Sequence, residues 1–132
     1  MTVPDYQSLM LPLLRVLSDG RELELGPVRT EMAMALGLTE DDLREKFPSG
    51  TNYVWISRFH WAKTYLDKAG AVDTVRQGVV RISQRGRDLL AENPQRIDNA
   101  MLGRFSEFRA WKEAEAKLPG RIDSATEAHT AT

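Results

Sequence analysis

The stretch NYVWISRFHWAKTYLDKAGAVDTVRQGVVRIS, residues 52–83, decides the fold that we expect for this chain. Its first half predicts a long amphipathic helix over residues 52–69, because its apolar residues recur at helical spacing. Its second half holds two runs rich in β-branched residues, at 71–75 and 79–83, around a glycine-containing turn at 76–78. The sequence therefore predicts a well-patterned helix followed directly by a β-hairpin.

Three helices and a short strand are expected before this stretch. The first helix covers about residues 5–17, and Pro12 in its interior predicts either a kink or an effective start near Leu9. Thr39 precedes three acidic residues, which is typical of a helix N-terminus. The remaining elements are a strand at 22–25, a helix over 28–36 and a short helix over 40–46.

After the hairpin, a helix capped by Ser83 is expected to run to Leu90, and apolar residues at 97–118 predict one or two more helices. We expect a mainly α fold with a small β-hairpin: a winged helix-turn-helix with a C-terminal helical extension. The predicted domain covers residues 3–118, with a wing at 71–83 and the extension at 97–118. Residues 119–132 are small and polar, as in a disordered tail or an interdomain linker.

The composition excludes several classes of site. Cysteine is absent, and the two histidines, His60 and His129, lie far apart in the sequence, so we expect no disulfide, no metal site and no cofactor. No apolar run reaches the roughly 18 to 20 residues that cross a bilayer, and the N-terminus lacks the order of a signal peptide. The expected location is the cytoplasm, with no membrane partner.

Charge is distributed unevenly along the chain, although the net formal charge is only −1. Residues 1–51 carry 5 basic and 9 acidic side chains, whereas residues 52–90 carry 7 basic and 3 acidic ones. A basic segment in a neutral protein is typical of a surface that meets phosphates, although chance clustering on a solvated surface gives the same pattern. The predicted helix and hairpin lie in this basic segment.

This element order indicates a partner, double-stranded DNA. A helix fits the major groove, and an adjacent hairpin can lay basic side chains on the phosphate backbone. Small donors at the start of the helix could hold a phosphate, Asn52 could instead read an adenine edge, and helix capping is an equally good explanation for residues 49–52. The candidate DNA-binding residues are Ser49, Thr51, Asn52, Tyr53, Ser57, Arg58, His60, Lys63, Arg76, Gln77 and Arg81.

No catalytic residue is expected. Trp55, Trp61 and Tyr65 have the spacing of core residues, which we favour over a stacking pocket for a flipped base. Glu115-Ala116-Lys117 resembles half of a metal-dependent nuclease site, but no strand bearing a second acidic residue precedes it. We interpret these three residues as part of a solvated helix face.

A set of short motifs resembles the N-terminal domain of Mrr-type restriction proteins over about residues 3–112. The combination of Arg58-x-x-Trp61-Ala62, a following Ala-Gly, and an Arg-Gly after the hairpin is fairly specific. The motifs are VPDY at 3–6, LMLPLL at 9–14, GLTE at 37–40, PSG at 48–50, SR at 57–58, WAKTYL at 61–66, KAG at 68–70 and GVVRISQRG at 78–86.

The resemblance implies a winged-helix domain that docks a type IV endonuclease onto modified, often methylated, DNA. It further implies that cleavage belongs to a separate C-terminal nuclease domain of the Asp…(Glu/Gln)-x-Lys class, so this chain itself is expected not to be an enzyme. Family members commonly have a basic or amide-rich start to the reader helix, and Asn52-Tyr53-Val54-Trp55 departs from that pattern. A stand-alone transcriptional regulator and a protein-interaction module remain alternatives, and a homodimer stays open.

Overall fold

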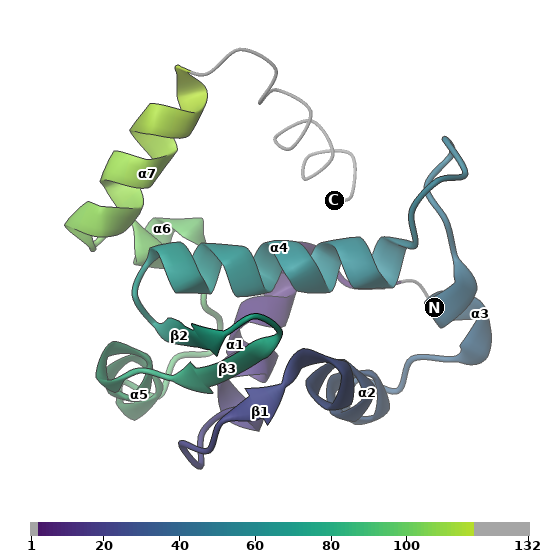
Figure 1. The fold of residues 1–132 in the computed structure, drawn as a ribbon, viewed down its shortest axis with the longest axis horizontal. Helices are drawn as coiled ribbons and strands as arrows, with labels where there is room; N and C mark the ends of the chain where they lie inside the picture. The colour runs from purple at the N-terminus through teal and green to yellow at the C-terminus, as the bar shows by residue number, and fades with distance from the viewer. Residues whose placement is uncertain (1–2, 118–132) are drawn as a thin grey trace.

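Helices and a small sheet alternate along residues 3–117, the part of the chain that the computed structural model describes. Figure 1 shows α4 crossing the molecule in front of α1, with the sheet beside them and α7 rising at one end. The expected fold class, mainly helical with a small antiparallel sheet in a winged-helix-like arrangement, is confirmed. The elements are α1 (Tyr6–Val16), β1 (Leu23–Glu24), α2 (Leu25–Ala35), α3 (Glu40–Arg44), α4 (Val54–Lys68), β2 (Val72–Arg76), β3 (Val79–Ile82), α5 (Gln84–Ala91), α6 (Asn99–Leu102) and α7 (Ser106–Ala116).

The sheet has the strand order β1-β3-β2, with both pairs antiparallel. The hairpin of β2 and β3, called the wing below, turns at Gln77 and Gly78, and Gly78 has a φ of 79°, in the left-handed region that favours glycine. The Gly78 carbonyl accepts a hydrogen bond of 2.9 Å from the amide of Leu25 at the start of α2. The wing is therefore short, and its turn is attached to α2.

The core forms mainly where α1 packs against α4. Both helices turn one apolar side inward, and side chains from the two helices are completely buried between them, including Leu9, Leu13, Phe59 and Leu66. Burying each such side chain contributes about 1.5–3 kcal/mol. The apolar spacing that predicted both helices is thus the pattern that joins them.

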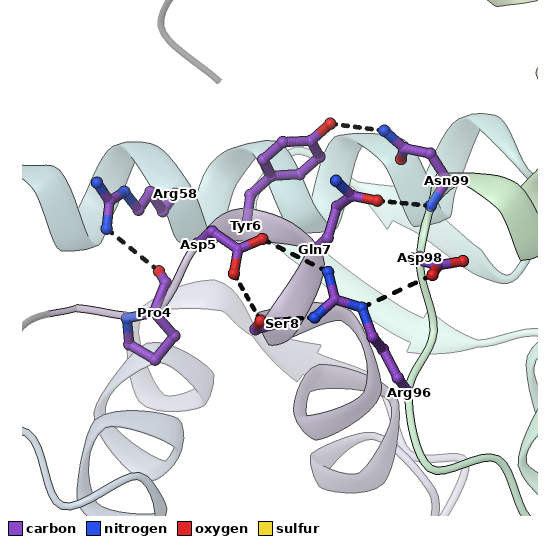
Figure 2. Close-up of polar contacts among 9 residues, drawn as sticks. All are labelled: Pro4, Asp5, Tyr6, Gln7, Ser8, Arg58, Arg96, Asp98 and Asn99. Carbon is purple, nitrogen blue, oxygen red and sulfur yellow. Dashed lines mark hydrogen bonds and ion pairs between the residues drawn. The ribbon is translucent and has the colours of Figure 1, made fainter. Parts of the chain in front are cut away.

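Pro12 lies inside α1 without delaying the start of the helix. The helix begins at Tyr6, so the predicted start near Leu9 is wrong. Its first turn is held by the first residue of α6: the Tyr6 hydroxyl accepts a hydrogen bond of 2.7 Å from the side-chain amide of Asn99, and the Gln7 side chain accepts one of 2.9 Å from the Asn99 backbone N–H (Figure 2). These tertiary contacts stabilise a turn that local propensity would leave weak. Burial raises the pKa of Tyr6 to about 12.

The segment between α3 and α4, called the 46–53 loop, is a small hairpin rather than helix. Lys46 and Tyr53 form an antiparallel bridge, and the Phe47 amide donates to the Asn52 carbonyl at 3.1 Å. The helix expected over 40–46 consequently ends at Arg44, and the helix expected from residue 52 begins at Val54. Figure 1 shows this loop projecting beyond the N-terminal end of α4.

The helix after the wing begins as expected, with Ser83 as its N-cap accepting from the Gly86 amide at 3.1 Å. The Ser83 hydroxyl also donates to the Gly70 carbonyl at 2.5 Å. A Cβ at Gly86 would lie 2.3 Å from the Ala71 carbonyl oxygen, so only glycine allows this approach. The wing, α5 and the end of α4 are thus packed as one unit.

The C-terminal extension packs onto the same core. Arg85 joins its parts: the guanidinium donates to the Ala69 carbonyl and to Glu107, each at 2.9 Å, and lies 4.3 Å from the centre of the Phe105 ring. The rings of Tyr65 and Trp111 meet edge to face, 5.0 Å apart. The expected extension is therefore helical and attached, while the proposed tail or linker at 119–132 lies outside the described residues. None of the helices in residues 3–117 is long and apolar enough to cross a membrane.

Candidate nucleic-acid interface

One side of α4 points away from the core and carries Ile56, His60 and Lys63; together with the N-cap residue Tyr53 we call it the outward face. These residues follow one another at intervals of three and four, so they form a line along the helix. A helix with its side chains is about 10–12 Å across, which matches the width of the major groove, about 12 Å. Tyr53 is 41% exposed, and Ile56 is 45% exposed.

Three basic side chains from two helices gather at this face. Lys63 and His60 come from α4, and Arg29 comes from α2, where its guanidinium lies 5.6 Å from the centre of the Phe59 ring. Burial and the positive charges of Lys63 and Arg29 lower the pKa of His60 below its usual value. The imidazole is therefore in a positive environment that an anion would relieve.

The C-terminal end of α4 differs because it carries a carboxylate. Asp67 accepts a hydrogen bond of 2.7 Å from the Thr74 hydroxyl of the wing, and it lies 3.7 Å from the ammonium of Lys63. This contact joins the wing to α4 and partly neutralises Lys63, whose side chain is only 15% exposed. The N-terminal half of α4 is consequently the better place for phosphates and base edges.

The 46–53 loop carries, besides Tyr53, three of the residues predicted to contact DNA. Ser49 and Thr51 are exposed, with their hydroxyl oxygens 3.0 Å apart, and Asn52 is exposed beside them. The N-cap of α4 is Tyr53, which makes no side-chain cap, so capping does not explain this cluster. The Val54 amide, at the start of α4, donates a hydrogen bond of 2.9 Å to the Glu45 carbonyl. Ser49, Thr51 and Asn52 therefore belong to a loop beside the candidate interface, and not to the N-terminus of the helix.

The wing holds the other predicted basic contacts, and both are paired with carboxylates. Arg76 lies 3.2 Å from Glu22, while Arg81 lies 3.9 Å from Glu22 and 3.9 Å from Asp73. Gln77 is exposed in the turn. The wing therefore offers hydrogen-bond donors with little excess positive charge.

Arg58 is directed away from the outward face, toward the N-terminal segment. Its guanidinium donates to the Val3 carbonyl at 2.5 Å. It also donates to the Pro4 carbonyl at 3.5 Å (Figure 2). Burial lowers its pKa, and the nearby carboxylates of Glu45 and Asp5 act in the opposite direction. The structure thus gives Arg58 a role in joining α4 to the N-terminal segment, and the neighbouring Ser57 is half-buried.

Two residues of this surface were missed by the sequence analysis. Ile56 lies one helical turn before His60, so the spacing that buries Trp55 and Phe59 would have placed it outward. Arg29 had no such signal, because its approach to α4 depends on how α2 packs. Trp55 and Tyr65 are buried and Trp61 is half-buried, which confirms the core interpretation for the first two.

The interpretation of residues 115–117 as a solvated face is wrong for Glu115. This carboxylate is buried, with Lys112 3.8 Å away, because α7 packs this side against α4. Lys112 also donates a hydrogen bond of 3.1 Å to the Tyr65 hydroxyl. Within residues 3–117, no group of three or more metal-ligating side chains is positioned to hold a metal ion.

Comparison with known proteins gives one family and one relative. The model of the Mrr N-terminal domain matches residues 6–92. The type IV methyl-directed restriction enzyme EcoKMrr of Escherichia coli (strain K12) is 33% identical over 125 residues, which are 94% of this chain and 40% of that enzyme. No solved structure is significantly similar. Since the family model covers most of the described fold, including α4 and the wing, the chain belongs to the Mrr N-terminal domain family.

Proposed function

We propose that this domain docks a restriction-system protein onto duplex DNA, with the outward face of α4 in the major groove and the wing along the adjacent backbone. The observation that carries the proposal is the outward face itself: exposed Tyr53, Ile56 and His60 on the helix that precedes the wing and at its N-cap, with Arg29 and the less exposed Lys63 near His60. A helix of this width fits the major groove, and the cations suit its phosphate borders.

Charge elsewhere on the domain supports this orientation. Across residues 3–117, several arginines outside the proposed interface bind carboxylates or backbone carbonyls that hold the extension in place, as Arg85 and Arg104 do. Arg29 belongs to none of the ion pairs found among the described residues, where it contacts an aromatic ring. Arg29 thus differs from the arginines of the extension, and also from Lys63, which lies 3.7 Å from Asp67.

The preferred DNA is proposed to be modified, with methylated bases. The relative is called methyl-directed, and the chain spans 40% of its length. Recognition would lie in this domain, and cleavage would require a further nuclease domain. The protein would then be a sensor whose binding decides where a separate domain cuts.

A salt-series titration tests the proposal. Fluorescence anisotropy would measure binding to one duplex in methylated and unmethylated form between about 0.05 and 0.2 M salt. Each phosphate contact should contribute about −0.9 to the slope of log affinity against log salt, and methylated duplex should bind more tightly. The variant Arg15→Gln, on an exposed site of α1, is the control and should bind as the parent does. Absence of binding to either duplex at low salt would overturn the proposal.

A further inference from the structure

We propose that Ile56, with Tyr53 beside it, forms an apolar contact for the C5 methyl group of a pyrimidine, carried by thymine or 5-methylcytosine. The inference rests on the proposed function, because it requires α4 to lie in the major groove. It goes further by assigning the discrimination of the methyl group to one side chain.

The first observation is where apolar surface is exposed. Among the described residues, the large hydrophobic side chains with substantial exposure are Met34 at 77%, Ile56 at 45% and Tyr53 at 41%. A single exposed hydrophobic residue is ordinary. Tyr53, however, is the N-cap of α4 and Ile56 lies in the first turn of that helix, so both exposed side chains belong to the same end of α4. Together they form an apolar pair on a face that is otherwise polar.

The second observation is the positive charge around this apolar pair. The Lys46 ammonium lies 5.1 Å from the centre of the Tyr53 ring, and His60 follows Ile56 by one turn, with Lys63 and Arg29 near it. Centres of protein–protein interfaces are depleted of charged residues, whereas a DNA groove places base edges between two rows of phosphates. Cations on both sides of an apolar pair therefore favour a base edge over a protein surface.

The third step is the chemistry of the ligand. In the major groove, thymine presents a methyl group at C5 and cytosine presents only a hydrogen there, so methylation gives cytosine the same apolar group. The isoleucine side chain has no hydrogen-bonding atom, and it can therefore distinguish pyrimidines only through such apolar contact. Burying one methyl should change the affinity about three- to fivefold for each contacted base.

The test uses one duplex sequence made in four base compositions. They combine thymine or deoxyuridine, which lacks the C5 methyl, with cytosine or 5-methylcytosine. The 132-residue chain should bind the deoxyuridine–cytosine duplex most weakly and gain about three- to fivefold when a contacted base carries the methyl. A loss of affinity when deoxyuridine replaces thymine identifies thymine as the source of the methyl group. A gain of affinity when cytosine is methylated identifies 5-methylcytosine as the source.

Three variants locate the effect. Ile56→Ser should bind all four duplexes alike while keeping its salt slope, and Ile56→Val should keep most of the discrimination. Met34→Ser removes an even more exposed side chain from α2 and should behave as the parent chain does. Thermal melting checks that each variant is folded.

The outcomes separate this inference from the proposed function. Equal affinity of the parent chain for all four duplexes, with normal salt dependence, would overturn the methyl contact and leave DNA docking intact. Discrimination that persists in Ile56→Ser would overturn the assignment to Ile56. No binding to any duplex would overturn both.

Discussion

The wing and the outward face of α4 are both candidates for DNA contact, but their basic side chains differ in how they are paired with carboxylates. The wing has two arginines, Arg76 and Arg81, and each lies within 4 Å of a carboxylate. On the outward face, Lys63 also lies 3.7 Å from a carboxylate, Asp67, but Arg29 belongs to none of the ion pairs found among the described residues, and burial together with the charges of Lys63 and Arg29 lowers the pKa of His60. The number of basic residues in a segment therefore does not determine its positive potential, since the fold decides which of them are already paired.

This comparison assigns different roles to the two regions. A phosphate at the wing has to compete with Glu22 for both arginines, whereas a phosphate near Arg29 meets a guanidinium that forms none of the ion pairs found among the described residues. We expect the outward face to contribute most of the electrostatic affinity and the wing to contribute less.

The largest loss of affinity is expected for Arg29→Gln combined with Lys63→Gln. Removing two phosphate contacts should lower affinity about tenfold or more at low salt and reduce the salt slope by about 1.8. Anisotropy titrations at several salt concentrations would measure both quantities. Arg15→Gln is the matched control, and an unchanged salt slope in the double variant would show that these cations do not meet phosphates.

A smaller loss is expected for Arg76→Ala combined with Arg81→Ala. Affinity should fall about three- to fivefold for all sequences, with a flatter salt slope, because these cations already share Glu22 and Asp73. The same anisotropy titrations measure the affinity and the salt slope of this variant. If the wing variant loses more affinity than the α4 variant, the proposed difference between the regions is reversed.

The opposite sign is expected for Glu22→Gln. Removing this carboxylate frees both wing arginines for phosphate, so affinity should rise about two- to threefold and the salt slope should become steeper. Glu24→Gln, which alters an exposed carboxylate that forms none of the described ion pairs, serves as the control. Weaker binding by Glu22→Gln would indicate that its pairs with Arg76 and Arg81 organise the wing for binding.

A weak pH dependence is expected from His60. Its pKa in the unbound protein lies below the usual value, and a nearby phosphate would raise that pKa. DNA binding should then take up a proton, so affinity should increase as pH falls from about 7 through the usual histidine pKa of about 6.5. Titrations at pH 7.5 and 6 would measure the change, and His60→Gln should abolish it. A pH dependence unchanged by the substitution would exclude His60 as its source.

The smallest effect on DNA binding is expected for Arg58→Ala, although its sequence position suggested a contact. Its guanidinium holds the carbonyls of Val3 and Pro4, so the substitution should lower the free energy of unfolding by about 1–3 kcal/mol. Urea denaturation would measure the loss of stability. The salt slope of the folded variant should match that of the parent chain, and a reduced slope would return Arg58 to the interface.

The sequence was sufficient for the order of the elements because the pattern is local. The helical spacing in α1 and α4 and the caps at Thr39 and Ser83 lie within a few residues of the structure that they specify. The 46–53 loop was missed because its bridge requires Lys46 and Tyr53 to meet, which no helical or strand periodicity encodes.

The candidate site was less predictable because its key contacts join distant parts of the chain. Glu22 and Arg76 are 54 positions apart, and Arg58 and Val3 are 55 apart. Neither pairing can be read from a single segment. The sequence therefore predicted a more basic wing than the structure has, and it predicted that Arg58 is available for DNA contact. Glu115 seemed solvated for the same reason, because its burial depends on where α7 packs.

Chemical-shift mapping of the ¹⁵N-labelled chain with a methylated duplex tests the location of the interface most directly. The largest amide shifts should occur from Tyr53 to Lys63 and in the 46–53 loop, with smaller ones in the wing and little change in α7. Shifts centred on α7, or on the exposed side of α1 near Arg15, with α4 unaffected, would contradict the assignment of α4 as the DNA-reading helix.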